Sequence, residues 1–145
     1  MPSCYLLTCC VGSAVDQETN NMSLFNLVEQ INVPPGSPPP PGGVVPLEAH
    51  AYWRMPPADL GNNFEIRFVV VSVHTGLETS SNVFTHRAVT ERFRTRTMGL
   101  PCPPVPGVYE LRVDWRMEGT EAWNREAAAW PVTLAEVEPQ PRVLN

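Results

Sequence analysis

The sequence predicts an all-β protein in which two antiparallel sheets pack face to face. Short segments rich in β-branched and aromatic residues recur along the 145-residue chain, and turn-forming Gly, Pro and Asn residues separate them. There is neither a convincing amphipathic helix nor the strand–helix alternation that accompanies a parallel sheet. About seven strands joined by proline-rich loops are typical of an immunoglobulin-like sandwich, and a barrel is the alternative.

Seven segments carry the strand pattern: 3–11, 23–33, 45–54, 63–74, 83–96, 107–117 and 126–137. In the sixth, Tyr109, Leu111 and Val113 alternate with polar residues, which predicts a half-buried antiparallel strand. Tyr109 also matches the tyrosine corner of such sandwiches, in which the hydroxyl binds the preceding loop. The fourth segment alternates at first and then becomes apolar on both faces, which predicts a central strand.

The stretch DQETNNMSLFNLVEQI, residues 16–31, begins polar and ends apolar. Its first part, Asp16 to Asn21, has the side chains of a turn. Its second part, residues 23–31, is predicted as a strand. A helix stays open there as the alternative, because its apolar residues also recur at helical spacing.

The same stretch has the D-x-E-x-N opening of a calcium loop. That loop requires glycine at its sixth position and a bidentate glutamate at its twelfth. The chain has Asn21 and Leu27 at those positions, which argues against a calcium site of this type.

The composition excludes several classes of function. The formal net charge is -5, and all ten basic residues are arginine. An acidic chain lacks the basic footprint of a nucleic-acid-binding protein, so nucleic acid is disfavoured as a partner. No segment has the length of a membrane span or the layout of a signal peptide, and we expect a cytoplasmic protein with no membrane association.

The four cysteines are predicted to be free thiols, since the expected compartment is reducing. On a strand, Cys4 and Cys10 would share one face with Leu6, and Cys9 would lie on the other. The sequence spacing selects no cysteine–histidine pair for catalysis or for a metal. Phosphate-loop, dinucleotide and serine-hydrolase motifs are absent. We therefore predict no catalytic residue, no metal site and no cofactor.

Arginines are concentrated in THRAVTERFRTRT, residues 85–97, where Arg92, Arg94 and Arg96 fall on one face of a strand. Such a stripe can bind phosphates or an acidic protein surface. The alternative is a solvated face, neutralised by cross-strand carboxylates such as Glu110 or Asp114. The three arginines are candidate partner-binding residues.

Tryptophans provide a second candidate for binding. Trp115 continues the apolar face of its strand and is expected in the core. Trp123 lies near a predicted hairpin tip, where an exposed aromatic ring can contact a partner or a carbohydrate.

Two stretches, AVDQETNNMSLFNLVEQI at 14–31 and PGVYELRVDW at 106–115, flank a proline-rich connection. This order of features resembles a family of small bacterial proteins of unknown function. The resemblance implies a β-sandwich for most of the chain, and it implies no activity and no catalytic residues.

These observations predict one β-sandwich domain over residues 1–138 and a flexible tail over 139–145. The proline-rich block at 32–46 is interpreted as a stiff connection rather than as a peptide ligand. The favoured function is a non-enzymatic binding or adaptor module for a protein partner, with self-association through strand edges as a further option. The alternatives are a small-molecule or carbohydrate-binding module and a thiol-dependent enzyme.

Overall fold

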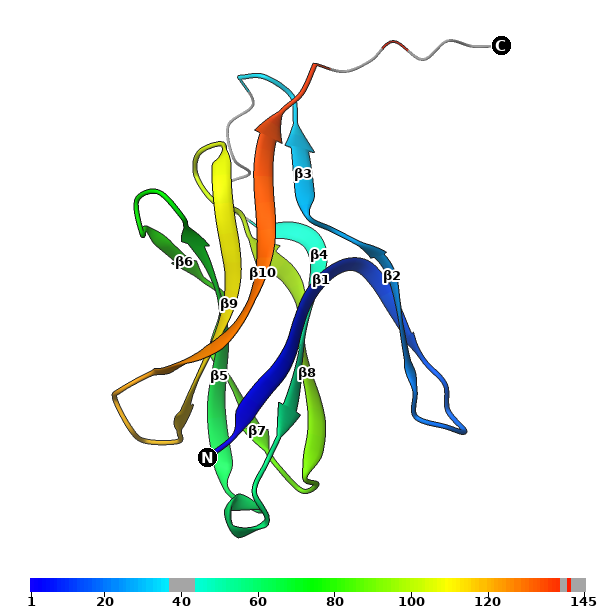
Figure 1. Ribbon diagram of the computed structural model, residues 1–145, viewed down its shortest axis with the longest axis vertical. Helices are drawn as coiled ribbons and strands as arrows, with labels where there is room; N and C mark the ends of the chain where they lie inside the picture. The colour runs from blue at the N-terminus through cyan, green and yellow to red at the C-terminus, as the bar shows by residue number, and fades with distance from the viewer. Residues whose placement is uncertain (37–43, 139–140, 142–145) are drawn as a thin grey trace.

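The computed structural model describes residues 1–36, 44–138 and 141, and the fold is all-β with two sheets (Figure 1). Among the described residues, the helical structure is limited to the short 3-10 turn η1 (Pro57–Asp59). The strands are β1 (Ser3–Val15), β2 (Met22–Leu27), β3 (Gln30–Val33), β4 (Val44–Arg54), β5 (Asn63–Ser72), β6 (Glu78–Ser80), β7 (Phe84–Arg87), β8 (Arg92–Pro101), β9 (Gly107–Met117) and β10 (Asn124–Glu136). The predicted all-β class with two sheets is confirmed.

The strands form a four-stranded sheet and a six-stranded sheet. Sheet A has the order β2-β1-β4-β8 and is antiparallel throughout. Sheet B has the order β3-β10-β9-β5-β6, with β7 also paired to β5, and it is strongly curled. Its pairing is antiparallel except between β10 and β3.

Ten strands replace the seven that were predicted, because two segments divide and one strand was missed. The segment 23–33 is extended, as the favoured interpretation predicted, but β2 joins sheet A while β3 joins sheet B. The crossing follows Val28, whose backbone amide still donates to Cys9 of β1, whereas the carbonyl of Glu29 already accepts from Thr133 of β10. The segment 83–96 divides in the same way into β7 and β8.

The core lies between the inner faces of the two sheets. Its largest fully buried side chains include Trp53 of β4, Phe64 and Phe68 of β5 and Leu111 of β9. Trp115 is also buried there, as the alternation predicted, and its ring meets Phe64 edge to face at 5.8 Å between centroids. Contacts of this kind add to the free energy of burial itself.

Tyr109 binds the loop before its own strand, as predicted. Its hydroxyl donates a hydrogen bond to the carbonyl oxygen of Val105, and its ring is buried. This contact closes the loop between β8 and β9 against the core.

The predicted faces of the cysteines are wrong at Cys4. A β-bulge between Cys4 and Leu6 shifts the alternation by one residue, so Cys4 enters the core with Leu7 and Cys9. Leu6 points outward instead and is 43% exposed. Cys10 lies on the opposite face from Cys9, as expected, and all four cysteines are free thiols.

The turn predicted at 16–21 connects β1 to β2. The Asp16 carboxylate accepts hydrogen bonds from the backbone amides of Glu18 and Thr19, and the backbone of Asn20 donates to Asp16. The hairpin projects from the rest of the molecule (Figure 1). These bonds form a rigid turn without any need for a bound cation.

Some predictions fall outside the described residues. They concern part of the proline-rich block, residues 37–43, and nearly all of the predicted tail at 139–145. No helix in the described part of the chain is long and apolar enough to cross a bilayer.

Candidate functional site

The outer face of sheet A carries four arginines: Arg54, Arg92, Arg94 and Arg96. We call these four residues the arginine face. Pairing of β4 with β8 sets Arg54 opposite Arg92, and the alternation of β8 turns the other two outward as well. The three arginines of β8 therefore lie on one face of the strand, as predicted.

The inner side of β8 is what orients the arginine face. Phe93 stacks on Trp53 with 6.0 Å between centroids, and the Trp53 indole donates a hydrogen bond of 2.8 Å to Thr95. Because both inward side chains are held against a fully buried tryptophan, Arg94, which lies between them, points outward, as do Arg92 and Arg96 on either side.

Within the described residues, no member of the arginine face forms an ion pair with a carboxylate. Arg94 donates to the amide oxygen of Asn20 at 2.9 Å, and Arg96 donates to the Ser13 hydroxyl at 3.4 Å. The guanidinium of Arg54 lies over the ring of Tyr5 at 5.2 Å. These partners are all neutral, so the positive charge of this face is not cancelled by direct contact.

The predicted neutralisation of the arginines by Glu110 or Asp114 is wrong. Both carboxylates lie on β9, which belongs to the other sheet. Glu110 binds Arg112, and Asp114 binds Arg67 and Arg125. Alternation along β8 and β9 predicts which residues share a face of each strand, but it does not predict the sheet to which the strand belongs.

Two hollows open beside the arginine face, one of about 350 Å³ and one of about 630 Å³. The larger one lies between the β1–β2 turn and strands β4 and β8. Its walls include Tyr5, Asn20, Tyr52, Arg92 and Arg94. It offers guanidinium, amide and phenol donors to one bound group, which is a set suited to carboxylate or phosphate oxygens.

Trp123 lies on the other side of the molecule, and the structure does not bring it to the arginine face. The guanidiniums of Arg67 and Arg116 lie over its ring, 4.4 Å and 4.3 Å from the centroid. Both arginines are engaged in ion pairs of sheet B. The ring already has cationic partners within the chain, so it is a poor platform for an external ligand.

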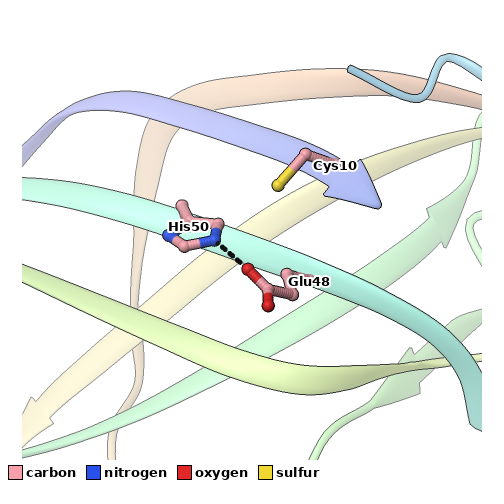
Figure 2. A group of neighbouring side chains, drawn as sticks. All are labelled: Cys10, Glu48 and His50. Carbon is pink, nitrogen blue, oxygen red and sulfur yellow. Dashed lines mark hydrogen bonds and ion pairs between the residues drawn. The ribbon is translucent and has the colours of Figure 1, made fainter. Parts of the chain in front are cut away.

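Beneath the rim of the arginine face lie Cys10, Glu48 and His50, which we call the buried cluster (Figure 2). Their exposed fractions are 0%, 7% and 0%. Cys10 pairs with Glu48 across β1 and β4, and His50 follows two residues later on the same face. Figure 2 shows the thiol of Cys10 directed toward the other two side chains.

Glu48 is the hydrogen-bonding centre of the buried cluster. Its Oε2 atom lies 2.8 Å from Nε2 of His50 and accepts a 2.7 Å hydrogen bond from the Ser13 hydroxyl. The bond from Ser13, and then the proximity of His50 and Arg96, hold the pKa of Glu48 below its ordinary value. The carboxylate is therefore ionised at neutral pH although it is nearly enclosed.

Every cysteine has a raised pKa. Burial raises the pKa of Cys10, and the Glu48 carboxylate raises it further. Burial also raises the pKa of Cys4 to about 11 and of Cys9 to about 12, and it raises that of Cys102. These groups are protonated thiols at neutral pH, whereas a cysteine nucleophile requires a lowered pKa.

Sequence reasoning missed the buried cluster. A signal was present in the segment 45–54, where Glu48 and His50 place two titratable side chains on one face of an otherwise apolar strand. Cys10 could be added only from the register between β1 and β4.

No family model matches this chain, and no curated protein matches it. The resemblance to small bacterial proteins stays a prediction, and the function is argued from the geometry described above.

Proposed function

We propose that this protein is a non-enzymatic, immunoglobulin-like β-sandwich that binds an acidic segment of a protein partner through the arginine face. The observation that carries the proposal is that Arg54, Arg92, Arg94 and Arg96 form no ion pair with a carboxylate in the described chain. The chain contains 15 acidic and 10 basic residues, so the arginines do not lack partners for want of carboxylates.

Several features support the immunoglobulin-like architecture. Two sheets enclose one core, and a tryptophan from a central strand lies within it. The Tyr109 hydroxyl binds the preceding loop, as the tyrosine corner of such domains does. In these folds the sheet faces and end loops are common sites of protein binding.

The chemistry of the larger hollow favours carboxylates. A guanidinium can hold a carboxylate with two parallel hydrogen bonds, and such charge-assisted bonds are roughly twice as strong as neutral ones. Tyr5 and Tyr52 add aromatic surface, with 6.2 Å between their ring centroids. Arginine and tyrosine together are enriched among the residues that dominate protein interfaces.

The alternative functions have less support. A carbohydrate platform at Trp123 competes with the two guanidiniums that already cover the ring. A thiol-dependent enzyme would need an activated cysteine, and the pKa of each cysteine is raised. Nucleic acid is disfavoured by the net charge of -5, which repels phosphates outside the arginine face.

The experiment is fluorescence anisotropy with a labelled glutamate-rich peptide and two variants of equal charge. Arg94→Ala removes a wall of the larger hollow, and Arg87→Ala removes an exposed arginine of β7, in sheet B. We expect Arg94→Ala to weaken binding about tenfold, which corresponds to about 1.4 kcal/mol, the scale of one charged hydrogen bond. Arg87→Ala should change the affinity less than about twofold.

Equal losses in the two variants would show that the peptide responds only to net charge, and the proposal would then fail. A lysine-rich peptide of the same length and a single-stranded oligonucleotide are the control ligands in the same assay. Tighter binding of the oligonucleotide than of the glutamate-rich peptide would assign the arginine face to nucleic acid instead.

A further inference from the structure

We propose that the buried cluster of Cys10, Glu48 and His50 is a binding site for a divalent transition-metal ion of the zinc type. The inference is independent of the proposed partner, because it concerns side chains enclosed beneath the arginine face rather than the arginines themselves.

The first argument is geometric. One donor atom from each of the three residues lies within 4.8 Å of the other two. In a tetrahedral zinc site, ordinary metal–ligand lengths place nitrogen and oxygen ligands about 3.4 Å apart and sulfur and nitrogen ligands about 3.6 Å apart. Nε2 of His50 and Oε2 of Glu48 are 2.8 Å apart, so they need to separate by only about half an ångström.

The second argument comes from the donor set. A thiolate, an imidazole and a carboxylate are the three ligand types that zinc accepts, and two of them are anionic when metal is bound. Together they balance the charge of a divalent ion. The thiolate and imidazole favour zinc, cobalt or copper over magnesium and calcium, which prefer all-oxygen sites.

The third argument is a pair of buried polar atoms that lack partners. Within the described part of the chain, Nδ1 of His50 and Oγ1 of Thr8 make no hydrogen bond, although both residues are buried. Such atoms are rare in native proteins and call for a physical explanation. Thr8 and His50 are directly opposite each other on β1 and β4, and their side chains share the outer face.

A metal on Nε2 explains this pair. Metal-bound histidine carries its proton on the other ring nitrogen and usually donates it to a neighbouring oxygen. In this protein the candidate acceptor is the hydroxyl of Thr8, which lies opposite His50 on the neighbouring strand. Metal binding would thus replace the bond between His50 and Glu48 and would also satisfy both buried atoms.

The surroundings supply a candidate fourth ligand and one opposing charge. The Ser13 hydroxyl of β1 is 2.7 Å from the Glu48 carboxylate and is a further oxygen that could bind the ion. Arg96 reaches that hydroxyl at 3.4 Å. Its positive charge lowers the affinity for a cation, but two anionic ligands face the ion directly and outweigh it.

The experiment is titration of the full-length, reduced and metal-free protein with Co²⁺ and then with Zn²⁺. Cobalt bound by a thiolate gives a sulfur-to-metal charge-transfer band, and a tetrahedral site gives intense visible bands. We expect one equivalent of Co²⁺ to produce both signals and Zn²⁺ to displace it. The Tm should rise with the Zn²⁺ concentration, because the ion binds the folded state.

Matched variants separate this site from incidental binding. Cys10→Ala removes a ligand and leaves a small apolar side chain, and Cys102→Ala removes a thiol outside the buried cluster. We expect Cys10→Ala to abolish the charge-transfer band and to weaken Zn²⁺ binding at least about 100-fold, while Cys102→Ala retains both. Thr8→Val should weaken binding about tenfold without altering the charge-transfer band.

Three outcomes would overturn the proposal. They are the absence of a charge-transfer band in the wild-type protein, a band that survives in Cys10→Ala, and a Zn²⁺ affinity equal in Cys10→Ala and Cys102→Ala. Circular dichroism of each metal-free variant shows whether it is folded. If Cys10→Ala is unfolded, Cys10→Ser takes its place, with the same expected loss of the band.

Discussion

The outer faces of the two sheets hold arginines in opposite ways. On sheet B, Arg67 and Arg125 both bind the carboxylate of Asp114, which is 1% exposed, and Arg125 also binds Glu78. On sheet A, the arginine face has only neutral partners among the described residues. Arginines therefore complete an ion-pair network on sheet B, whereas the arginines of sheet A keep hydrogen-bond donors available for a partner.

We infer from this difference that the arginines of sheet B contribute to the stability of the fold and those of sheet A to the binding of a partner. A buried carboxylate is costly unless cations surround it, so the arginines of sheet B are required once Asp114 is enclosed. On sheet A, no member of the arginine face forms an ion pair with a carboxylate in the described residues, and only Arg96 lies near a buried one, that of Glu48. Substitutions on sheet B should change the free energy of unfolding, and those on sheet A should change affinity.

The largest expected effect is that of Asp114→Ala. It leaves Arg67 and Arg125 together without their shared carboxylate, and we expect a loss of about 3 to 5 kcal/mol in the free energy of unfolding, measured in urea. The control is Glu110→Ala, whose partner Arg112 is on the same sheet but whose side chain is 45% exposed. That change should cost less than about 1 kcal/mol. Similar costs for the two variants would contradict the proposed division between the faces.

The next comparison tests the arginines directly. Arg125→Gln removes charged hydrogen bonds to Asp114 and Glu78, and we expect it to cost about 2 kcal/mol of stability. Arg94→Gln removes one bond to a neutral amide and should cost less than about 0.5 kcal/mol. Binding of the glutamate-rich peptide should show the reverse order, with the larger loss in Arg94→Gln. Losses of both properties in one variant would show that the faces are coupled.

Parts of this fold could be predicted because their cause is local. The alternation in 107–117 identifies β9, and the polar residues of 16–21 identify the turn after β1. The strand β6 has the sequence Glu-Thr-Ser, which contains no apolar residue, so nothing in its composition marks it as a strand. It is a strand because its backbone pairs with the edge of β5.

The parts that could not be predicted depend on register and on sheet membership. The chain passes from one sheet to the other between Val28 and Glu29, and the bulge after Cys4 turns that residue into the core. The buried cluster requires Cys10 to pair with Glu48, which no local pattern specifies. The arginines of β8 were found because alternation within one strand is sufficient to group them.

Trp123→Ala tests whether the loop after β9 contributes to stability, as the arginines of sheet B do, rather than to peptide binding. The ring lies beneath two guanidiniums, each contact contributing about 0.5 to 1 kcal/mol. We expect the variant to lose about 1 to 2 kcal/mol in thermal or urea unfolding and to keep its affinity for the acidic peptide. A variant of normal stability that no longer bound the peptide would assign Trp123 to the binding site.

The smallest expected effect is the pH dependence contributed by Glu78. Its hydrogen bond to Arg125 holds the pKa of this carboxyl below its ordinary value of 4.5. Because the folded pKa is the lower one, the stabilisation is present above 4.5 and is lost as the pH falls through the folded value. The side chain is 38% exposed, so solvent screening limits the contribution to less than about 1 kcal/mol.

Comparison of the wild-type protein with Glu78→Gln isolates this contribution. At neutral pH the wild-type protein should be the more stable of the two, and the difference should vanish in acid, where the carboxyl is protonated in both the folded and unfolded states. Urea unfolding at a series of pH values measures it. A difference that persisted unchanged in acid would mean that Glu78 acts through packing rather than charge, and the ion-pair network of sheet B would then depend on Asp114 alone.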